Sequence, residues 1–142
     1  MQFSTKTRYG IRAMIEIAME EGKTAVFLKD IAEKQNLSIK YLDHIIASLK
    51  RAGLIKTFKG RKSGYMLERE PGSISMYDIH VAFSNEICVI DCLCEGVECD
   101  RKSSCAVFDF WEELNNRIIE YLKSVNLTDL VNKKISLSAL NH

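Results

Sequence analysis

The sequence has no long apolar run and no motif of a familiar enzyme. No stretch approaches the roughly 18 apolar residues that a membrane-spanning helix requires, and the polar start from Met1 to Arg8 does not resemble a signal peptide. A phosphate-binding glycine loop, a catalytic triad and a paired-carboxylate motif are also missing. We therefore expect a cytoplasmic protein that is not an enzyme and has no membrane partner.

Cysteine is absent from the whole sequence except for one segment. All five cysteines lie within the eighteen residues from Cys88 to Cys105. An odd number of cysteines cannot pair completely in internal disulfides, and the reducing cytoplasm disfavours a disulfide framework. The crowding of thiols in one short loop therefore favours metal binding or redox chemistry.

The net charge of +1 hides an asymmetry between the two halves of the 142-residue chain. Residues 1–67 carry 13 Lys and Arg against 6 Asp and Glu, a net charge of +7, whereas residues 68–142 carry 7 against 13, a net charge of −6. A basic half favours a polyanionic partner, and an acidic half is available for dimerisation or sensing. Chance segregation of solvated charges would give the same counts, so the local pattern has to decide.

Helical periodicity predicts a helix-turn-helix in the basic half. A first helix begins at residues 4–5 and carries apolar residues at helical spacing until Gly22. A second helix runs from about Leu28 to Gln35, and Ser38 caps a third helix that ends near residues 52–53. Two short helices across a tight turn are typical of DNA-binding proteins.

The third helix presents polar side chains near its N-terminus, the end that would enter a major groove. The candidates for contacts with base edges and phosphates are Ser38, Lys40, Tyr41 and His44. Taken alone, such a face is more often only solvated, and the next segment is what favours DNA binding.

Residues 54–68 predict two short strands around a turn from Gly60 to Gly64, which is the pattern of a wing. Lys59 and Arg61 stand at the tip, where they can reach the minor groove or its phosphates. A basic hairpin directly after a helix-turn-helix is much more specific for DNA binding than either part alone.

Pro71-Gly72 marks a boundary between a DNA-binding domain, residues 1–70, and a second part, residues 71–142. A short helix from Met76 to about Phe83 follows, and its His80 is interpreted as a packing or surface residue rather than a ligand. Beyond the sensor loop, residues 88–105, a long helix is predicted at 106–124 with a short helix after it. Apolar residues recur along one stripe of the long helix: Phe108, Trp111, Leu114, Ile118, Tyr121, Leu122 and Val125. We expect a second copy of the chain to cover part of this stripe.

Together these segments resemble the IscR, NsrR and CymR family of winged-helix repressors. The resemblance covers nearly the whole chain and rests on four segments, STKTRYGIRAMIEIA, LSIKYLDHIIASLKRAGLI, KGRKSGYML and CAVFDFWEELNNRI. It implies a mostly α-helical fold with a small β-hairpin wing, in which a winged helix-turn-helix precedes a long C-terminal dimerisation helix. It also implies a homodimer on a partly palindromic double-stranded DNA operator. The residues that match the family's DNA contacts are Ser38, Lys40, Tyr41 and His44 in the recognition helix, and Lys59 and Arg61 in the wing.

The resemblance further implies an iron-sulfur cluster, either 2Fe-2S or 4Fe-4S, bound by the cysteine loop. Cys99 and Cys105 match the last two cysteines of the family's cluster loop. The first family cysteine falls on Leu93, which Cys92 and Cys94 flank. Thiolates are soft anionic ligands suited to such clusters, so the candidate metal ligands are Cys92, Cys94, Cys99 and Cys105.

The fourth ligand is where this sequence departs from the family. A histidine completes the site in some members and an aspartate in others, and the matching positions here hold Phe108 and Arg8. An all-cysteine site remains available, with the fourth sulfur coming from Cys88, Cys92 or Cys94.

We therefore expect a transcriptional repressor whose operator binding depends on a cluster that senses iron, redox state or nitric oxide. Three alternatives stay open. The cysteines can bind zinc, although no pair of C-x2-C knuckles supports a structural zinc site. They can act as a thiol switch in which Cys92 or Cys94 is oxidised and a neighbour resolves it. The chain can also be a cluster-free regulator controlled by a protein partner.

Overall fold

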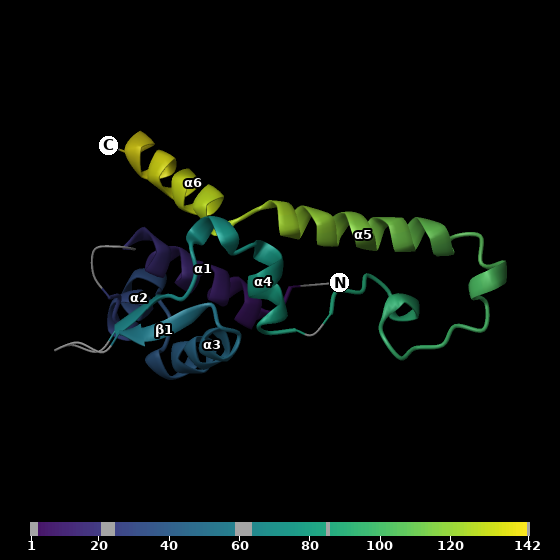
Figure 1. The fold of residues 1–142 in the computed structure, drawn as a ribbon, viewed down its shortest axis with the longest axis horizontal. Coiled ribbons are helices and arrows are strands. Elements are labelled where there is room, and N and C mark those ends of the chain that lie inside the picture. The colour runs from purple at the N-terminus through teal and green to yellow at the C-terminus, as the bar shows by residue number, and fades with distance from the viewer. Residues whose placement is uncertain (1–2, 21–24, 59–63, 85, 142) are drawn as a thin grey trace.

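The computed structural model describes residues 3–20, 25–58, 64–84 and 86–141, and the structural statements below concern these residues. Most of them are helical, and one antiparallel hairpin is present. The elements are α1 (Thr5–Met19), α2 (Leu28–Gln35), α3 (Ile39–Arg51), β1 (Ile55–Phe58), β2 (Gly64–Leu67), α4 (Met76–Val81), α5 (Phe108–Ser124) and α6 (Leu127–Leu140). Figure 1 shows a packed body from which α5 and the loop before it project. We call residues 86–124 the cysteine arm and the rest the winged-helix body.

The helix-turn-helix forms because α1, α2 and α3 each bury one apolar face in a common core. Asn36 adopts a left-handed conformation with φ of 52°, which ends α2. The Ser38 hydroxyl then accepts a hydrogen bond of 3.1 Å from the Tyr41 N–H and caps α3. The predicted turn and cap are confirmed, and with the hairpin they give the expected winged helix-turn-helix.

The wing is held to the body by a third extended segment. β1 pairs with β2 in a register that runs from Ile55 opposite Leu67 to Phe58 opposite Gly64. Val26 bridges to Tyr65 on the other side of β2, with hydrogen bonds of 3.0 and 2.8 Å. The wing tip, residues 59–63 with Lys59 and Arg61, lies outside the described residues.

The starts of α4 and α6 lie side by side, and each is closed by a capping box. Ser75 and Asp78 form the box of α4, and Asn126 and Asp129 form that of α6. Backbone hydrogen bonds join the two starts, from the Met76 N–H to the Val125 carbonyl at 2.8 Å and from the Leu127 N–H to the Ile74 carbonyl at 2.9 Å. The backbone just after α5 is therefore joined to the backbone at the start of α4.

A glycine lets the turn after α4 pack tightly on α1. A Cβ atom at Gly10 would lie only 2.4 Å from the ring of Phe83, so a side chain there requires the ring to move. His80 is also buried close by, with an exposed fraction of 7%, and meets the Phe3 ring edge-to-face at 5.3 Å. Burial lowers the pKa of His80 from its usual value. His80 is thus a packing residue.

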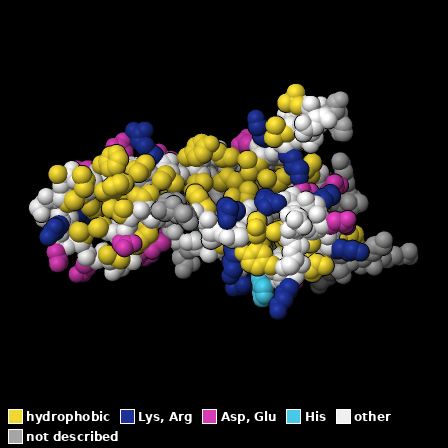
Figure 2. All heavy atoms as spheres, turned by 180° about the vertical axis from the view of Figure 1, so that it is seen from behind, with side chains coloured by type: hydrophobic (Ala, Val, Ile, Leu, Met, Phe, Trp, Pro, Cys, Tyr) yellow, Lys and Arg dark blue, Asp and Glu magenta, His cyan; other side chains and the backbone are white. Residues whose placement is uncertain are grey.

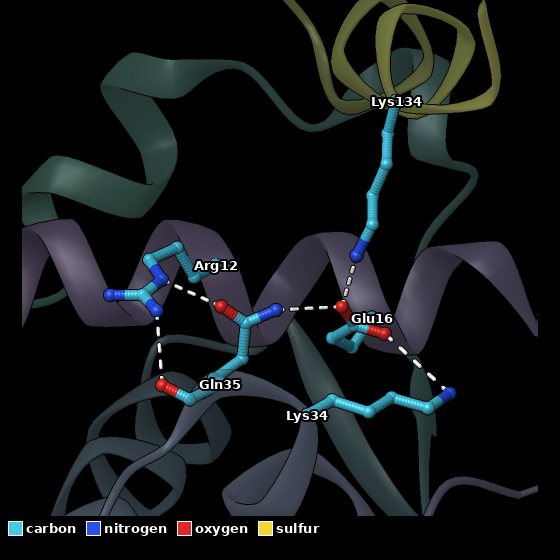
Figure 3. Close-up of polar contacts among 5 residues, drawn as sticks. All are labelled: Arg12, Glu16, Lys34, Gln35 and Lys134. Atoms are coloured by element: carbon cyan, nitrogen blue, oxygen red, sulfur yellow. Dashed lines mark hydrogen bonds and ion pairs between the residues drawn. The ribbon is translucent and has the colours of Figure 1, made fainter. Parts of the chain in front are cut away.

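A buried carboxylate connects α6 to the helix-turn-helix (Figure 3). Glu16 of α1 is 4% exposed, accepts a hydrogen bond of 2.7 Å from Gln35 and forms ion pairs with Lys134 and, at 3.7 Å, Lys34. Burial alone would raise the pKa of Glu16, but the hydrogen bonds and positive charges around it outweigh burial and lower it. The Lys134 contact requires α6 to continue well past its first turn. The expectation of a short final helix was therefore wrong, since α6 reaches Leu140.

The cysteine arm buries little of its apolar surface within the chain. Of the 17 residues of α5, only Phe108 and Asn115 are buried, while Phe110 and Tyr121 are 59% and 69% exposed. Figure 2 shows hydrophobic side chains gathered along the arm, whereas Lys and Arg lie mainly over the body. Despite this apolar face, none of the described helices combines the length and the apolar character needed to cross a bilayer.

Candidate DNA interface and cysteine site

The N-terminal end of α3 presents three of its four candidate DNA contacts to solvent. Ser38, Lys40 and His44 are exposed. Tyr41 is half-buried because its ring packs edge-to-face on Tyr9 of α1, with 5.8 Å between the ring centres. The Ser38 hydroxyl is already engaged in the helix cap, so the groups free for a DNA partner at this end are chiefly Lys40 and His44.

Basic side chains continue from α3 toward the wing. Lys50 and Arg51 at the end of α3 and Lys56 on β1 are all exposed, and no Asp or Glu intervenes between them in the sequence. An exposed cationic surface of this kind attracts the phosphate backbone of DNA.

The structure sorts the five sulfurs into a pair and a triplet. Cys88 and Cys94 are joined in a disulfide, with their Cα atoms 5.2 Å apart. The free thiols are Cys92, Cys99 and Cys105, of which Cys92 is exposed and the others are half-buried. Of the four predicted metal ligands, Cys94 is therefore the one whose sulfur is engaged elsewhere.

The three free thiols lie close enough to influence each other. The pKa of Cys92 is raised, first by its hydrogen bond and charge interaction with Cys99 and to a smaller extent by Cys105. A thiolate next to another thiolate is disfavoured, which is why the proton of Cys92 is held more tightly. A bound cation would reverse this effect, because it neutralises the repulsion between the sulfurs.

Tight turns separate the two groups of sulfurs. Residues Asp91–Leu93 form a 3-10 turn that contains Cys92, whereas Cys94 follows the turn in extended backbone. Cys92 and Cys94 consequently face different neighbours. A second 3-10 turn, Lys102–Ser104, ends at Cys105, which lies three residues before the start of α5.

The two positions that match the family's fourth ligand hold unsuitable side chains. Phe108 is buried, and the Lys102 ammonium lies 4.9 Å from the centre of its ring. Arg8 is an exposed guanidinium that donates to the Thr5 hydroxyl. Neither side chain offers a lone pair for a metal.

Asn115 joins the cysteine loop to α5, and the sequence analysis missed this role. Its side-chain amide donates to the Ile87 carbonyl at 3.0 Å, and its carbonyl oxygen accepts from the Val89 N–H at 2.9 Å. Asn115 therefore holds the peptide groups on both sides of Cys88. Its position was the available sign, because a polar residue four after Trp111 and three before Ile118 lies on the apolar stripe.

Glu86 is a further residue that the sequence analysis did not single out. A carboxylate oxygen of Glu86 and the sulfurs of Cys88 and Cys94 all lie within 4.8 Å of one another. The carboxylate also accepts a hydrogen bond of 2.8 Å from the Glu95 N–H. It thus closes the same loop that the disulfide closes.

Comparison with known proteins gives consistent matches along almost the whole chain. Residues 3–133 match the family Rrf2, described as "Iron-dependent Transcriptional regulator". The HTH-type transcriptional regulator IscR of Vibrio vulnificus is 30% identical, with 100% of this chain and 89% of the relative covered.

Two solved structures are similar in fold as well as in sequence. CymR of B. subtilis, described as the global cysteine regulator, has a TM-score of 0.78 at 33% identity, with 94% of this chain and 98% of that chain covered. T. potens IscR has a TM-score of 0.75 at 35% identity, with 94% and 88% covered.

Proposed function

The chain belongs to the Rrf2 family of transcriptional regulators, and from this premise we propose that it binds its operator as a homodimer under the control of an iron-sulfur cluster. Family membership makes it a DNA-binding transcriptional regulator, which confirms the expectation that it is not an enzyme. The proposal adds two points to family membership. A cluster controls the binding of DNA in the cytoplasm, and DNA binding represses the regulated genes.

The recognition helix α3 would read the major groove. The exposure of Lys40 and His44 near its N-terminus supports this role, and the other free amides of the first turn, next to Ser38, can donate to a phosphate. Lys59 and Arg61 of the wing would contact the minor groove or its flanking phosphates. The basic charge of the body suits each of these contacts.

The partly exposed stripe of α5 supports a homodimer. Only two of the 17 residues of α5 are buried within the chain, so most of its apolar side chains stay in contact with water. Exposed apolar stripes of this kind often mark the surface that binds another protein. A second copy of α5 offers a matching apolar surface, and a two-fold dimer would present two recognition helices to a partly palindromic operator.

The observation that carries the cluster proposal is that three cysteines of one short loop are free, with Cys99 beside Cys92. Cys92, Cys99 and Cys105 supply soft anionic ligands, and a bound cation would offset the repulsion that Cys92 meets from Cys99. The fourth ligand stays open between Cys88 and Cys94, each of which is bonded to the other here. When bound, an iron-sulfur cluster supplies a redox-active centre that responds to iron supply, oxidants or nitric oxide.

The arm's own residues would transmit the state of the loop to the DNA-binding surface. Asn115 ties the loop to α5, and the bridge between Ser75 and Asn126 ties the chain just after α5 to the body. A change in the order of the loop can therefore shift α5, and with it the spacing or tilt of the two recognition helices. Regulation requires that the two loop states differ in their contacts with DNA.

The direct test is purification without oxygen, followed by visible absorbance and by iron and sulfide counts. We expect the wild-type protein to be coloured, and Cys99→Ala and Cys105→Ala to lose the absorbance and the dependence of operator affinity on iron. Ser103→Ala, in the same loop, is the matched control and should keep both. Retained absorbance and regulation in both cysteine variants would refute the ligand assignment, and colourless wild-type protein would refute the cluster.

A further inference from the structure

Two of the five sulfurs are set apart from the three assigned to the cluster. The Cα atoms of Cys88 and Cys94 are 5.2 Å apart, within the range that a disulfide requires. Cys92 instead has Cys99 and Cys105 as its neighbours. The loop thus contains a second group of sulfurs that the proposed cluster does not use in this arrangement.

We propose that Cys88 and Cys94 form a reversible dithiol–disulfide site that hydroperoxides oxidise. This site is distinct from the three-thiol group, and it rests on the proposed function in one respect: because Cys88 or Cys94 is the fourth ligand there, the disulfide and a cluster with four cysteine ligands exclude each other. It gives the chain a response to peroxide in addition to the control proposed above.

The chemistry balances with a hydroperoxide as the oxidant. One thiolate attacks the peroxide, so that a sulfur–oxygen bond forms, the O–O bond breaks and the departing oxygen leaves as water or an alcohol after taking up a proton. The second thiolate attacks the resulting sulfenic sulfur, so that the disulfide forms and hydroxide leaves as water. The two sulfurs lose two electrons to the peroxide, and a dithiol reductant returns them by thiol–disulfide exchange.

Contacts other than the disulfide already hold Cys88 in place. Asn115 accepts from the Val89 N–H and donates to the Ile87 carbonyl, so the peptide groups before and after Cys88 are both bonded to α5. Asn115 is itself buried, with 9% of its surface exposed. The position of Cys88 therefore does not require the sulfur–sulfur bond.

Cys94 is positioned from its own side of the loop. Its N–H donates to the Asp91 carbonyl at 3.0 Å, and its carbonyl accepts from the Val97 N–H at 3.2 Å. The Glu95 N–H is bonded to the Glu86 carboxylate, which brings the two ends of the 86–95 loop together. After peroxide has oxidised one of these sulfurs to a sulfenic acid, a second thiolate held this close attacks it much faster than a free thiolate would.

The site is also accessible to a small oxidant. Both cysteines are half-buried rather than enclosed, and residues 95–98 after Cys94 are exposed. The same two sulfurs with Glu86 could instead hold a soft divalent metal, but a sulfur in a disulfide has no thiolate to offer, so the two fates exclude each other. The arrangement of the pair favours the disulfide.

The test maps the link by mass spectrometry on the full-length protein. The reduced protein is treated with hydrogen peroxide, its free thiols are alkylated, and it is digested with a protease that cleaves before aspartate. Cleavage before Asp78, Asp91 and Asp100 separates Cys88, in peptide 78–90, from Cys94, in peptide 91–99. We expect these two peptides to be joined in the wild type and in the matched control Cys92→Ser, and to be separate in Cys94→Ser and after treatment with a dithiol.

Three results would overturn the proposal. Alkylation of both Cys88 and Cys94 after peroxide would show that the pair does not form, and a joined pair of peptides in Cys94→Ser would show that Cys88 pairs with another sulfur. Zinc bound by the reduced wild type, lost in Cys88→Ser and protecting both thiols from peroxide, would assign the pair to a metal. The absorbance of Cys99→Ala tests the cluster independently, so the two proposals can fail separately.

Discussion

The winged-helix body and the cysteine arm differ sharply in how much they bury. One cluster of 18 buried apolar residues fills the body, and none of these residues comes from the arm. Among the described residues of the arm, only Ile87, Phe108 and Asn115 are buried. The body is thus stabilised by its own core, whereas the arm has few buried apolar side chains and is held by the polar contacts of Asn115 and Glu86, by the Cys88–Cys94 disulfide and by the packing of Leu122 on the body.

This difference agrees with the different tasks that we propose for the two regions. A DNA-reading surface needs side chains held in fixed positions, and the packed core under α3 provides that rigidity. A sensing element needs two states of similar free energy, and a sparsely packed loop provides them more easily. The four predictions that follow test this comparison, from the largest expected effect to the smallest.

Equivalent leucine truncations should have very different costs in the two regions. Leu42→Ala in α3 removes a fully buried side chain and should lower the free energy of unfolding by about 2–5 kcal/mol. Leu114→Ala in α5 removes a half-buried side chain and should cost about 1 kcal/mol or less in dilute monomer. Denaturant unfolding measures both values. Equal losses would contradict the comparison, and a loss for Leu114→Ala that grows with protein concentration would favour the homodimer.

Glu16→Gln should destabilise the body and remove part of its dependence on pH. The expected loss at neutral pH is about 1.5–3 kcal/mol, toward the lower end because Lys134 and Lys34 keep contact with water. Since the native pKa of Glu16 lies below 4.5, its contribution is complete above that pH and is lost as the pH falls through the lower native value. Unfolding measured between pH 7 and pH 3 should therefore decline less steeply in the variant. Glu33→Gln, on the exposed face of α2, is the matched control, and a parallel decline in Glu16→Gln and wild type would contradict the role of Glu16.

Asn115→Ala should loosen the arm while leaving the body intact. The change leaves the Val89 N–H and the Ile87 carbonyl without their partner, at a cost of about 1–2 kcal/mol that appears mainly as local opening. Amide hydrogen exchange should become faster at Val89 but not in α3. The neighbouring exposed Asn116→Ala is the control. Unchanged exchange at Val89 would mean that Asn115 does not hold the loop.

Ser38→Ala should have the smallest effect, confined to the first turn of α3. Loss of the bond between the Ser38 hydroxyl and the Tyr41 N–H should cost about 1 kcal/mol. Ser48→Ala on the same helix should change stability by a smaller amount, because its hydroxyl bonds only to a carbonyl within the helix. Thermal unfolding measures both variants. A larger loss in Ser48→Ala would show that the cap contributes little.

The body could be predicted from sequence because its information is local. Ser38 predicts the start of α3, and apolar residues at helical spacing predict which face of the helix is buried. The bounds of α2, Leu28–Gln35, agree with the periodicity, and the hairpin follows from residues that favour strands around a turn. Each of these features involves residues close together in the sequence.

The arm and the contacts of α6 could not be predicted in the same way. The ion pair of Glu16 with Lys134 joins residues 118 positions apart, which no local pattern reveals. The pairing of Cys88 with Cys94, rather than with Cys92, depends on the 3-10 turn between them. Spacing alone left Cys92 and Cys94 equivalent, and only the direction of their side chains distinguishes them.

The paired starts of α4 and α6 have a consequence for how such proteins can diversify. Because Ser75 and Asn126 face each other across a short backbone bridge, residues 76–125 form an excursion that begins and ends at almost the same place, and its first part, α4, packs on the body. Its far end can lengthen, shorten or exchange its chemistry without shifting the register of the DNA-reading scaffold. If the arm is the sensor that we propose, this placement would let one DNA-reading scaffold carry different sensing chemistry without a change in its own architecture.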